Sequence, residues 1–335
     1  MSGGREGSNG DTAKQRLPFS RILLTGADGF VGRTFVPALR QRMKPGARLL
    51  LATRMDPSEW PQDEEFVTFD LQDPGSIAAA VRDVLPDLVI HLAAQSSVGR
   101  SESEAAATWS INLCGSLALA QALATAVPDC TLLFTSSVEV YGLTFNEGIA
   151  TEKSPLRPQS AYARSKAAAE AMFADVLPAQ SRLIVARASN HSGPGQTDAF
   201  VIPAFADQIV RIERGEASVI RVGNLEAERD FLDVRDVVAA YLKLLEQAET
   251  LPKRNIFNIA SGTSVRIRTI LDRLRALSPA ETTVEQDPQR MRASEVARAA
   301  VDTSAIRRAI GWAPTHSLDD MLSSVLADRR GLVGD

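Results

Sequence analysis

The chain is poor in the residues that most often bind metal ions or form disulfides. It has only two cysteines, Cys114 and Cys130, and three histidines that stand far apart. The cysteines have no metal-type spacing, and the histidines form no cluster that would suit zinc. We therefore predict no metal site and no disulfide, and we interpret both cysteines as small buried residues.

Long hydrophobic runs are also missing. No apolar run approaches the roughly eighteen residues of a membrane-crossing helix, and the start, MSGGREGSNGDTAKQRLP, lacks the apolar core of a signal peptide. The net charge of -4 argues against a nucleic-acid-binding surface as the main function. We expect a cytoplasmic protein with no membrane or nucleic-acid partner.

Lysine and tyrosine are scarce, with six lysines and three tyrosines in the chain. Arginine is common, so one arginine says little, whereas one lysine in a chemically suitable place says more. Tyr162 and Lys166 stand in the segment PQSAYARSK at a spacing that places both side chains on one face of a helix. Any helix offers such pairs, so this spacing alone leaves open whether the two residues transfer a proton.

Short apolar runs and helical patterns alternate along much of the chain. Residues 1–19 are rich in Gly, Ser and polar groups, which is typical of a disordered extension. Over residues 20–189, runs such as RILLTG, ARLLLATR and CTLLFTSS alternate with stretches of helical periodicity. Such alternation requires right-handed crossovers and a mostly parallel sheet covered on both faces. We predict a doubly wound α/β domain of the Rossmann type.

The pattern becomes irregular over residues 190–330. This part contains a Gly-Pro-Gly segment, a predicted helix near 203–214 and a short apolar run, SVIRVG. In open α/β sheets ligands bind beyond the carboxyl ends of the strands, and inserted C-terminal segments usually cap that crevice. We therefore predict that residues 190–330 form mainly a substrate-binding lobe, with some segments returning to the first domain.

The segment TGADGFVG lies between the first predicted strand and the first predicted helix. Its glycines, Gly26, Gly29 and Gly32, permit a tight turn and close approach of a ligand. The helix N-terminus beyond them offers free N–H groups and a positive dipole to a pyrophosphate. The turn predicts a dinucleotide cofactor, and we assign Phe30 and Val31 to the same site.

The end of the second predicted strand bears on the choice of cofactor. NAD-preferring folds usually place an acidic residue there, but here the strand ends at Arg54 and no carboxylate follows until Asp56. A guanidinium can pair with a 2′-phosphate, which favours NADP(H) and leaves NAD(H) possible. A solvated arginine is the alternative. Asp70 and Leu71 are placed to meet the adenine ring, or to form only a strand-end turn.

Several motifs occur in one order along the chain. They are TGADGFVG, DL at 70–71, HLAA at 91–94, Asn112, SSVEVYG at 136–142 and YARSK at 162–166. This ordered set resembles the extended short-chain dehydrogenases/reductases of the NAD-dependent epimerase/dehydratase family, which modify nucleotide sugars. The resemblance covers nearly all of residues 21–330. It implies that Leu92, Ala93 and Ala94 also contact the cofactor.

The resemblance implies a role for each member of a catalytic set. Tyr162 would exchange a proton with the sugar oxygen, Ser137 would hydrogen-bond that oxygen, and Lys166 would hold the nicotinamide ribose. Tyr162 and Lys166 are therefore also assigned to the cofactor. Tyrosine has a reference pKa of about 10, which is too high for efficient proton exchange at neutral pH. A nearby ammonium lowers this pKa by stabilising the phenolate, so we expect Lys166 to lower the pKa of Tyr162.

Two positions after Ser137 bear on the reaction. Dehydratases that act on dTDP-glucose resemble one another in an Asp-Glu pair, and the acid position here is Val138, which cannot donate a proton. GDP-mannose 4,6-dehydratases keep only the Glu, which Glu139 matches. We therefore count Glu139 with the catalytic residues.

Four later segments resemble instead the family's reductases that make GDP-D-rhamnose. They are NHSGPGQ, FVIPAFADQI, VGNLEAERDFLDVRDVVAAYLKLL and RMRASEV. The leading expectation is NAD(P)H-dependent reduction of the C4 keto group of GDP-4-dehydro-6-deoxy-D-mannose. Dehydration of GDP-mannose, reduction to the C4 epimer GDP-6-deoxy-talose, and non-catalytic nucleotide sensing stay open as alternatives.

Seven polar residues are assigned to the substrate. Arg229 and Arg292 could clamp a nucleotide diphosphate, or could pair instead with Asp230 and Glu295. Two asparagines could hydrogen-bond the diphosphate or the sugar, and three residues beyond HLAA lie where a hexose rests in related enzymes, or form only a turn. The seven are Gln95, Ser96, Ser97, Asn190, Asn224, Arg229 and Arg292.

Helices predicted near 104–126 and 161–177 are rich in Ala and Leu. In related enzymes the equivalent helices pair across a two-fold axis into a four-helix bundle, so the resemblance implies a homodimer. Alanine-rich faces also pack on a chain's own sheet, so the composition of these helices agrees with both arrangements.

Overall fold

A computed structural model describes residues 16–54, 64–291 and 296–331 of the chain. Its centre is a seven-stranded sheet in the order β10-β6-β5-β4-β1-β2-β3, in which all neighbouring strands are parallel. The predicted doubly wound fold is therefore confirmed. The strands are β1 (Arg21–Thr25), β2 (Arg48–Thr53), β3 (Glu65–Thr68), β4 (Leu88–His91), β5 (Thr131–Ser137), β6 (Arg182–Ala188) and β10 (Arg254–Ile259).

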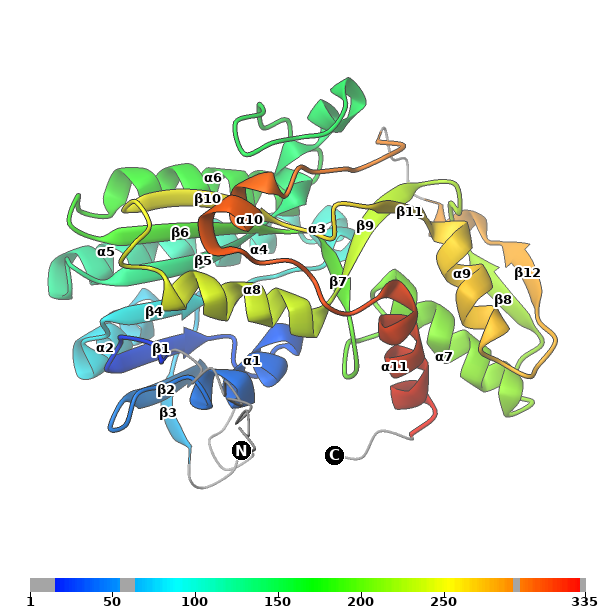
Figure 1. The fold of residues 1–335 in the computed structure, drawn as a ribbon, viewed down its shortest axis with the longest axis horizontal. Coiled ribbons are helices and arrows are strands. Elements are labelled where there is room, and N and C mark those ends of the chain that lie inside the picture. Colours follow the sequence, from blue (N-terminus) through cyan, green and yellow to red (C-terminus); the bar gives the residue numbers. More distant parts are fainter. Residues whose placement is uncertain (1–15, 55–63, 292–295, 332–335) are drawn as a thin grey trace, which may run out of the picture.

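Helices cover both faces of this sheet (Figure 1). One face packs against α1 (Phe30–Arg40), α8 (Val234–Glu246) and α10 (Ser304–Ile310). The other packs against α2 (Pro74–Val84), α5 (Ser116–Ala126) and α6 (Ala161–Val176). Successive side chains of a strand point to opposite faces, so Ile22 and Leu24 enter the first core and Leu23 enters the second.

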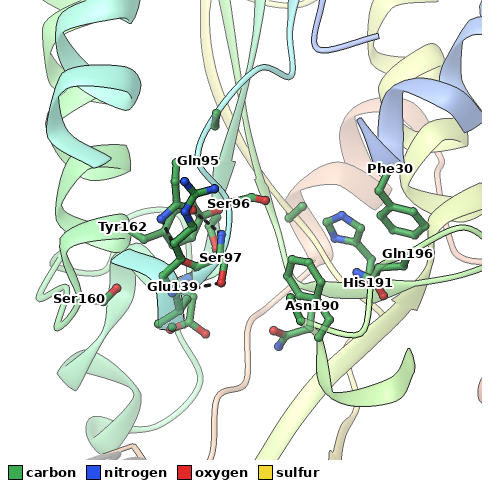
Figure 2. A pocket seen from close by; sticks show the side chains of 18 of the residues that line it. Phe30, Gln95, Ser96, Ser97, Glu139, Ser160, Tyr162, Asn190, His191 and Gln196 are labelled. Atoms are coloured by element: carbon green, nitrogen blue, oxygen red, sulfur yellow. Dashed lines mark hydrogen bonds between the residues drawn. The ribbon is translucent and has the colours of Figure 1, made fainter. Parts of the chain in front are cut away.

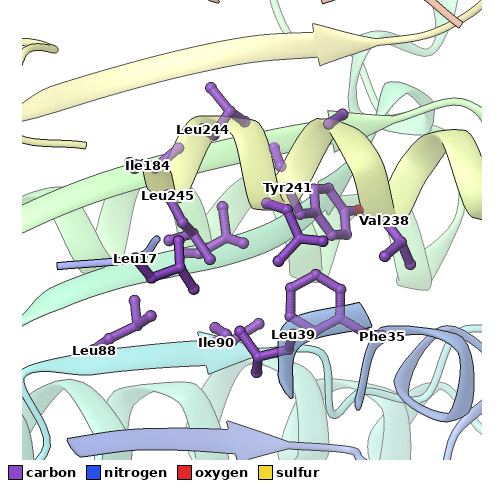
Figure 3. Close-up of a cluster of buried hydrophobic side chains, with 14 of the residues drawn as sticks. Leu17, Phe35, Leu39, Leu88, Ile90, Ile184, Val238, Tyr241, Leu244 and Leu245 are labelled. Carbon is purple, nitrogen blue, oxygen red and sulfur yellow. The ribbon is translucent and has the colours of Figure 1, made fainter. Parts of the chain in front are cut away.

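The first core shows how a distant segment completes the domain. Helix α8 lies beside α1, and the ring of Tyr241 meets the ring of Phe35 edge-on, with 6.2 Å between the ring centroids (Figure 3). Leu17 and Phe19 are also buried here. Our assignment of residues 1–19 to a disordered extension is thus wrong for these two positions, because their apolar side chains are covered by the core.

The helical stretch before residue 127 is divided into several pieces. These are α3 (Val98–Ser103), α4 (Ala105–Trp109), a π-helical turn (Ser110–Gly115) and α5. Gly115 packs closely against the loop that follows β3, because an added Cβ would stand 2.5 Å from the carbonyl oxygen of Leu71. Cys130 is buried as predicted, but Cys114 is exposed on the π-helical turn, so the prediction for it is wrong.

A smaller lobe stands beside the carboxyl ends of the large sheet's strands (Figure 1). It contains a three-stranded sheet in the order β11-β9-β7 and a pair, β8 with β12. Three helices close its own apolar core. Its elements are β7 (Asn190–Ser192), α7 (Val201–Glu213), β8 (Val219–Val222), β9 (Glu228–Asp233), β11 (Ser264–Arg266), α9 (Ile267–Ala276), β12 (Thr283–Gln286) and α11 (Leu318–Arg329).

Short 3₁₀ turns lie in the loops that follow β5 and β12. They are η3 (Val138–Tyr141), η4 (Leu143–Glu147) and η5 (Pro288–Arg290). After β9 of the lobe, the chain returns to the large sheet through α8 and β10, and it then enters the lobe again at β11. The backbone therefore crosses between the two parts more than once. Within the described ranges, no helix is both long and apolar enough to cross a bilayer.

Candidate active site

A cleft of about 1210 Å³ lies between the carboxyl ends of the sheet strands and the smaller lobe. This volume exceeds the usual range for one small ligand, so the cleft has room for a cofactor and a substrate. Every residue that we assigned to cofactor, substrate or catalysis lines this cleft, apart from Arg292, which lies outside the described residues. Figure 2 shows Tyr162 and Glu139 on one wall and Asn190 and His191 on the opposite wall.

The glycine turn has the shape of a cradle for a dinucleotide. Gly26 has a φ of +72°, and a Cβ there would stand 2.7 Å from the backbone nitrogen of Ala93. A Cβ on Gly32 would stand 2.2 Å from the carbonyl oxygen of Gly26. Gly29 is the N-cap residue of helix α1 and supplies no side-chain cap, which leaves the dipole of this helix open to an anion. The turn therefore fits a pyrophosphate.

Two residues that follow strands beside the glycine turn also line the cleft: Arg54 after β2 and Asp70 after β3. Arg54 is exposed and lines the cleft directly after β2. Asp70 also lines it, but its carboxylate accepts a hydrogen bond from the backbone N–H of Gln72 at 2.9 Å. The strand-end turn that we weighed for Asp70 is thus present, and its contact with an adenine ring stays a prediction.

Three side chains of the predicted catalytic set meet at the end of β5. Ser137 is its last residue, and its hydroxyl is hydrogen-bonded to the side chain of Tyr162. Ser160 caps helix α6 by accepting from the N–H of Ala163 at 3.1 Å, which places Tyr162 in the first turn. Lys166 follows one turn later and is 3% exposed.

The electrostatics of this set differ from our expectation. Burial raises the pKa of Tyr162 to about 12, and the hydrogen bond with Ser137 opposes that shift without cancelling it. Burial also lowers the pKa of Lys166 to about 8. The predicted lowering of the tyrosine pKa is therefore wrong for this structure, because loss of hydration disfavours the phenolate and the nearby charge of Glu139 raises the pKa further. The phenol is held as a neutral donor.

Asn112 joins two elements that border the catalytic set. Its Nδ2 donates to the carbonyl oxygen of Gln95 and to Ser165 Oγ, both at 3.0 Å. Its Oδ1 accepts from the N–H of Gln95 at 2.8 Å. The π-helical turn brings Asn112 to this place, as such turns often do near functional sites. The loop after β4 is thereby tied to α6 next to Lys166.

The side chain of Gln95 is used mainly to organise that loop. Its Oε1 accepts from the N–H of Ser97 at 2.6 Å, and its Nε2 donates to Ser97 O and to Thr108 Oγ1 at 3.2 Å. Both hydrogens of the amide are thus directed within the protein. A direct contact of Gln95 with a sugar stays a prediction, and it would use the remaining acceptor capacity of Oε1.

Glu139 lies on the 3₁₀ turn that follows Ser137. Its backbone N–H donates to Ser137 Oγ at 3.1 Å. Burial raises the pKa of Glu139, and the charge of Arg229 partly opposes this shift. The neighbouring Val138 is 3% exposed and belongs to an apolar cluster beneath the turn. Glu139 therefore lines the cleft, and its neighbour Val138 carries no acidic group.

The predicted substrate residues of the lobe stand on β7, β9 and the loop after β8. Arg229 Nη1 donates to the carbonyl oxygen of Glu228 at 2.8 Å. The Asp230 carboxylate accepts from Ser189 and from backbone N–H groups of residues 261–263. Asn190 Nδ2 donates to the Asp230 carbonyl at 3.3 Å. Asp230 therefore anchors the joint between lobe and sheet.

Sequence reasoning missed two residues of the opposite wall. His191 stacks on Phe30, with 6.0 Å between ring centroids and 9° between the planes, and its Nδ1 lies 2.9 Å from Ser189 O. Gln196 Nε2 donates to His191 O, and its Oε1 accepts from Ser192. Both residues stand in the segment NHSGPGQ, but no spacing in that segment predicts contact with the glycine turn.

Comparisons with known proteins agree with this geometry. A family model described as GDP-mannose 4,6 dehydratase matches residues 23–325. The chain is 35% identical over 311 residues to GDP-6-deoxy-D-mannose reductase of Pseudomonas aeruginosa, covering 92% of this chain and 96% of the relative.

Two solved structures are also similar to the chain. The structure of RMD from Pseudomonas aeruginosa complexed with NADPH has a TM-score of 0.77 at 33% identity, covering 94% of this chain and 100% of that one. UDP-glucose 4-epimerase of Thermus thermophilus in complex with NAD has a TM-score of 0.80 at 26% identity, covering 93% and 100%.

Proposed function

We propose that this chain, which belongs to the GDP-mannose 4,6-dehydratase family of extended short-chain dehydrogenases/reductases, reduces a nucleotide-linked keto sugar with NAD(P)H. The substrate that we propose is GDP-4-dehydro-6-deoxy-D-mannose, and the product is GDP-D-rhamnose. The observation that carries this proposal is the meeting of Ser137, Tyr162 and Lys166 in one cleft with the glycine turn. The 35% identity to a GDP-6-deoxy-D-mannose reductase supports the choice of substrate.

Each member of the catalytic set has a defined task in this proposal. When bound, the reduced nicotinamide supplies a hydride to C4 of the sugar. Ser137 donates a hydrogen bond to the C4 oxygen, and the neutral phenol of Tyr162 gives its proton to that oxygen as it becomes an alkoxide. Lys166 stabilises the phenolate that remains, from a position held by its hydrogen bond to Thr135 O.

The cofactor that we propose is NADP(H), with NAD(H) as the alternative. Arg54, exposed at the end of β2, supplies a guanidinium where a 2′-phosphate of NADP would lie. A similar solved structure holds NADPH and another holds NAD, so both cofactors occur among the relatives. The glycine cradle and the bare N-terminus of α1 fit the pyrophosphate of either one.

Dehydration of GDP-mannose is the second candidate, because Glu139 lines the cleft and the matching family model carries that name. This reaction would have to expel a hydroxyl from the sugar. Val138 cannot protonate a leaving hydroxyl, so Glu139 would have to do so alone. The reductase activity needs no such acid, and we therefore place it first.

Product analysis separates these reactions. We expect the purified protein to oxidise NADPH when it is mixed with GDP-4-dehydro-6-deoxy-D-mannose, and NMR of the product to show GDP-D-rhamnose. The C4 epimer, GDP-6-deoxy-talose, would correct the stereochemistry only. A keto product from GDP-mannose without added reductant would support the dehydratase, and binding without turnover would support nucleotide sensing.

We propose a homodimer through a four-helix bundle. Helices α5 and α6 pack side by side on one face of the sheet, and their alanines Ala118, Ala122, Ala167 and Ala168 are only partly buried within the chain. Small side chains allow close approach of a second pair of helices. Light scattering should give twice the 36.1 kDa chain mass, and Ala122→Glu should reduce the measured mass to that of one chain.

A further inference from the structure

A buried ion pair lies directly behind the catalytic set. The guanidinium of Arg187 on β6 donates to Glu170 on α6 through Nε at 3.0 Å and through Nη2 at 2.6 Å. The side chains are 3% and 6% exposed, and neither residue lines the cleft. Neither Arg187 nor Glu170 has a direct task in the proposed reduction.

The pair is connected to the elements that carry the catalytic residues. Ser136 Oγ donates to Glu170, and Ser136 directly precedes Ser137 on β5. Arg187 Nη1 donates to the hydroxyl of Tyr141 at 2.9 Å, and Tyr141 in turn donates to Asn258 Oδ1 at 2.7 Å. Helix α6, strand β5, strand β6 and the 3₁₀ turn with Glu139 therefore meet at one ion pair.

Glu170 also stands one helical turn after Lys166, on the same face of α6. Burial lowers the pKa of Lys166, and the charge of Glu170 opposes that shift. Arg187 does not lose its proton in proteins. The region thus holds two cations and one carboxylate, and the lysine is the cation that would deprotonate if the carboxylate were removed.

The other ionisable groups around this region do not replace Glu170. Burial lowers the pKa of His91 to about 3, so His91 is neutral near pH 7. Burial raises the pKa values of Tyr141 and Tyr162, so both phenols are neutral as well. Glu152 is near Tyr141, and its Oε1 accepts from the backbone N–H of Asn258. Glu139 is near Tyr162, on the cleft side.

We propose that Glu170 is a positioning residue for the reduction: its carboxylate keeps the Lys166 ammonium charged and fixes the end of β5 at Ser137. This inference rests on the proposed function for its kinetic consequence. Its electrostatic part can be measured without turnover, because the chain has only six lysines that NMR must resolve.

Two single variants and their double variant give different expectations for the charge of Lys166. Two quantities are measured: the pH at which Lys166 titrates, and the pH at which kcat falls on the alkaline side of its profile, called the alkaline limb. In Glu170→Gln both should move down by about one pH unit or more, because an attractive charge is lost. In Arg187→Gln both should move up, because Glu170 then faces Lys166 alone. In the double variant the two charges are removed together, and both should return close to the wild type.

Glu170→Asp, which keeps the charge, serves as the conservative control and should leave the limb in place. A purely structural pair predicts that every variant lowers kcat without moving the limb, and that result would overturn the proposal. If Glu170→Gln fails to fold, Arg187→Gln and the double variant still decide between the two outcomes. If the wild type does not oxidise NADPH, the proposed function fails, whereas the NMR titration of Lys166 still tests the role of Glu170.

Discussion

The Nζ atom of Lys166 donates a hydrogen bond of 2.8 Å to the carbonyl oxygen of Thr135. Thr135 is on β5, two residues before Ser137, so this bond ties the catalytic helix to the catalytic strand. The ammonium also lies 4.9 Å from the centroid of the Phe134 ring. A buried lysine is held in one place by these contacts, and several consequences can be measured.

Replacement of Tyr162 by Phe removes the proton donor and leaves the ring. We expect kcat to fall about 10²–10⁴-fold, which is the usual contribution of a positioned acid. NADPH affinity should change little, because the ring and Lys166 remain. Stopped-flow turnover and cofactor fluorescence check these two expectations, and a variant with near-normal kcat would remove Tyr162 from the proton-donor role.

The reduction rate should depend on the charge of Lys166. The pKa of this lysine is lowered to about 8 by burial, so the ammonium is present below that pH and is lost as the pH rises through it. Since the charged form stabilises the phenolate, we expect kcat to fall on the alkaline side, from about pH 8 upward. A pH profile of single-turnover rates measures this. A rate that rises through pH 8 would contradict the assignment.

Gly26 and Gly46 form a matched pair for testing the glycine turn. Both have positive φ, +72° and +77°, so an alanine at either position costs about 1–2 kcal/mol of backbone strain. Only at Gly26 would the new Cβ also meet the backbone of Ala93, at 2.7 Å, whereas nothing lies within 4 Å at Gly46. We expect Gly26→Ala to lose NADPH binding and Gly46→Ala to keep it. Calorimetric titration of both variants decides this.

Arg54 is the residue whose replacement should change cofactor preference. If its guanidinium pairs with the 2′-phosphate, Arg54→Ala should raise the KM for NADPH about tenfold or more, which is the effect of losing one charged hydrogen bond. The KM for NADH should stay nearly constant. Arg48, which is exposed at the start of β2 and pairs with Glu65, gives a control variant that leaves both constants unchanged. Equal effects of Arg54→Ala on both cofactors would refute the assignment.

The sequence predicted those parts of the site that depend on neighbours along the chain. Alternating strands and helices, the glycine turn and the one-turn spacing of Tyr162 and Lys166 are local features, because they follow from helix and strand periodicity. The sequence therefore determined the Rossmann fold and the glycine turn, Tyr162 and Lys166 of the cleft, whereas His191 and Gln196 of the opposite wall were missed.

The tertiary structure decided which distant groups meet and how their charges behave. Asn112 with Ser165 and Glu170 with Arg187 are joined by packing between separate elements. The raised pKa of Tyr162 likewise depends on burial by those elements. Periodicity tells which face of an element is buried, but hydration is lost only when the elements pack together, and this loss of hydration is the largest cause of the raised pKa of Tyr162.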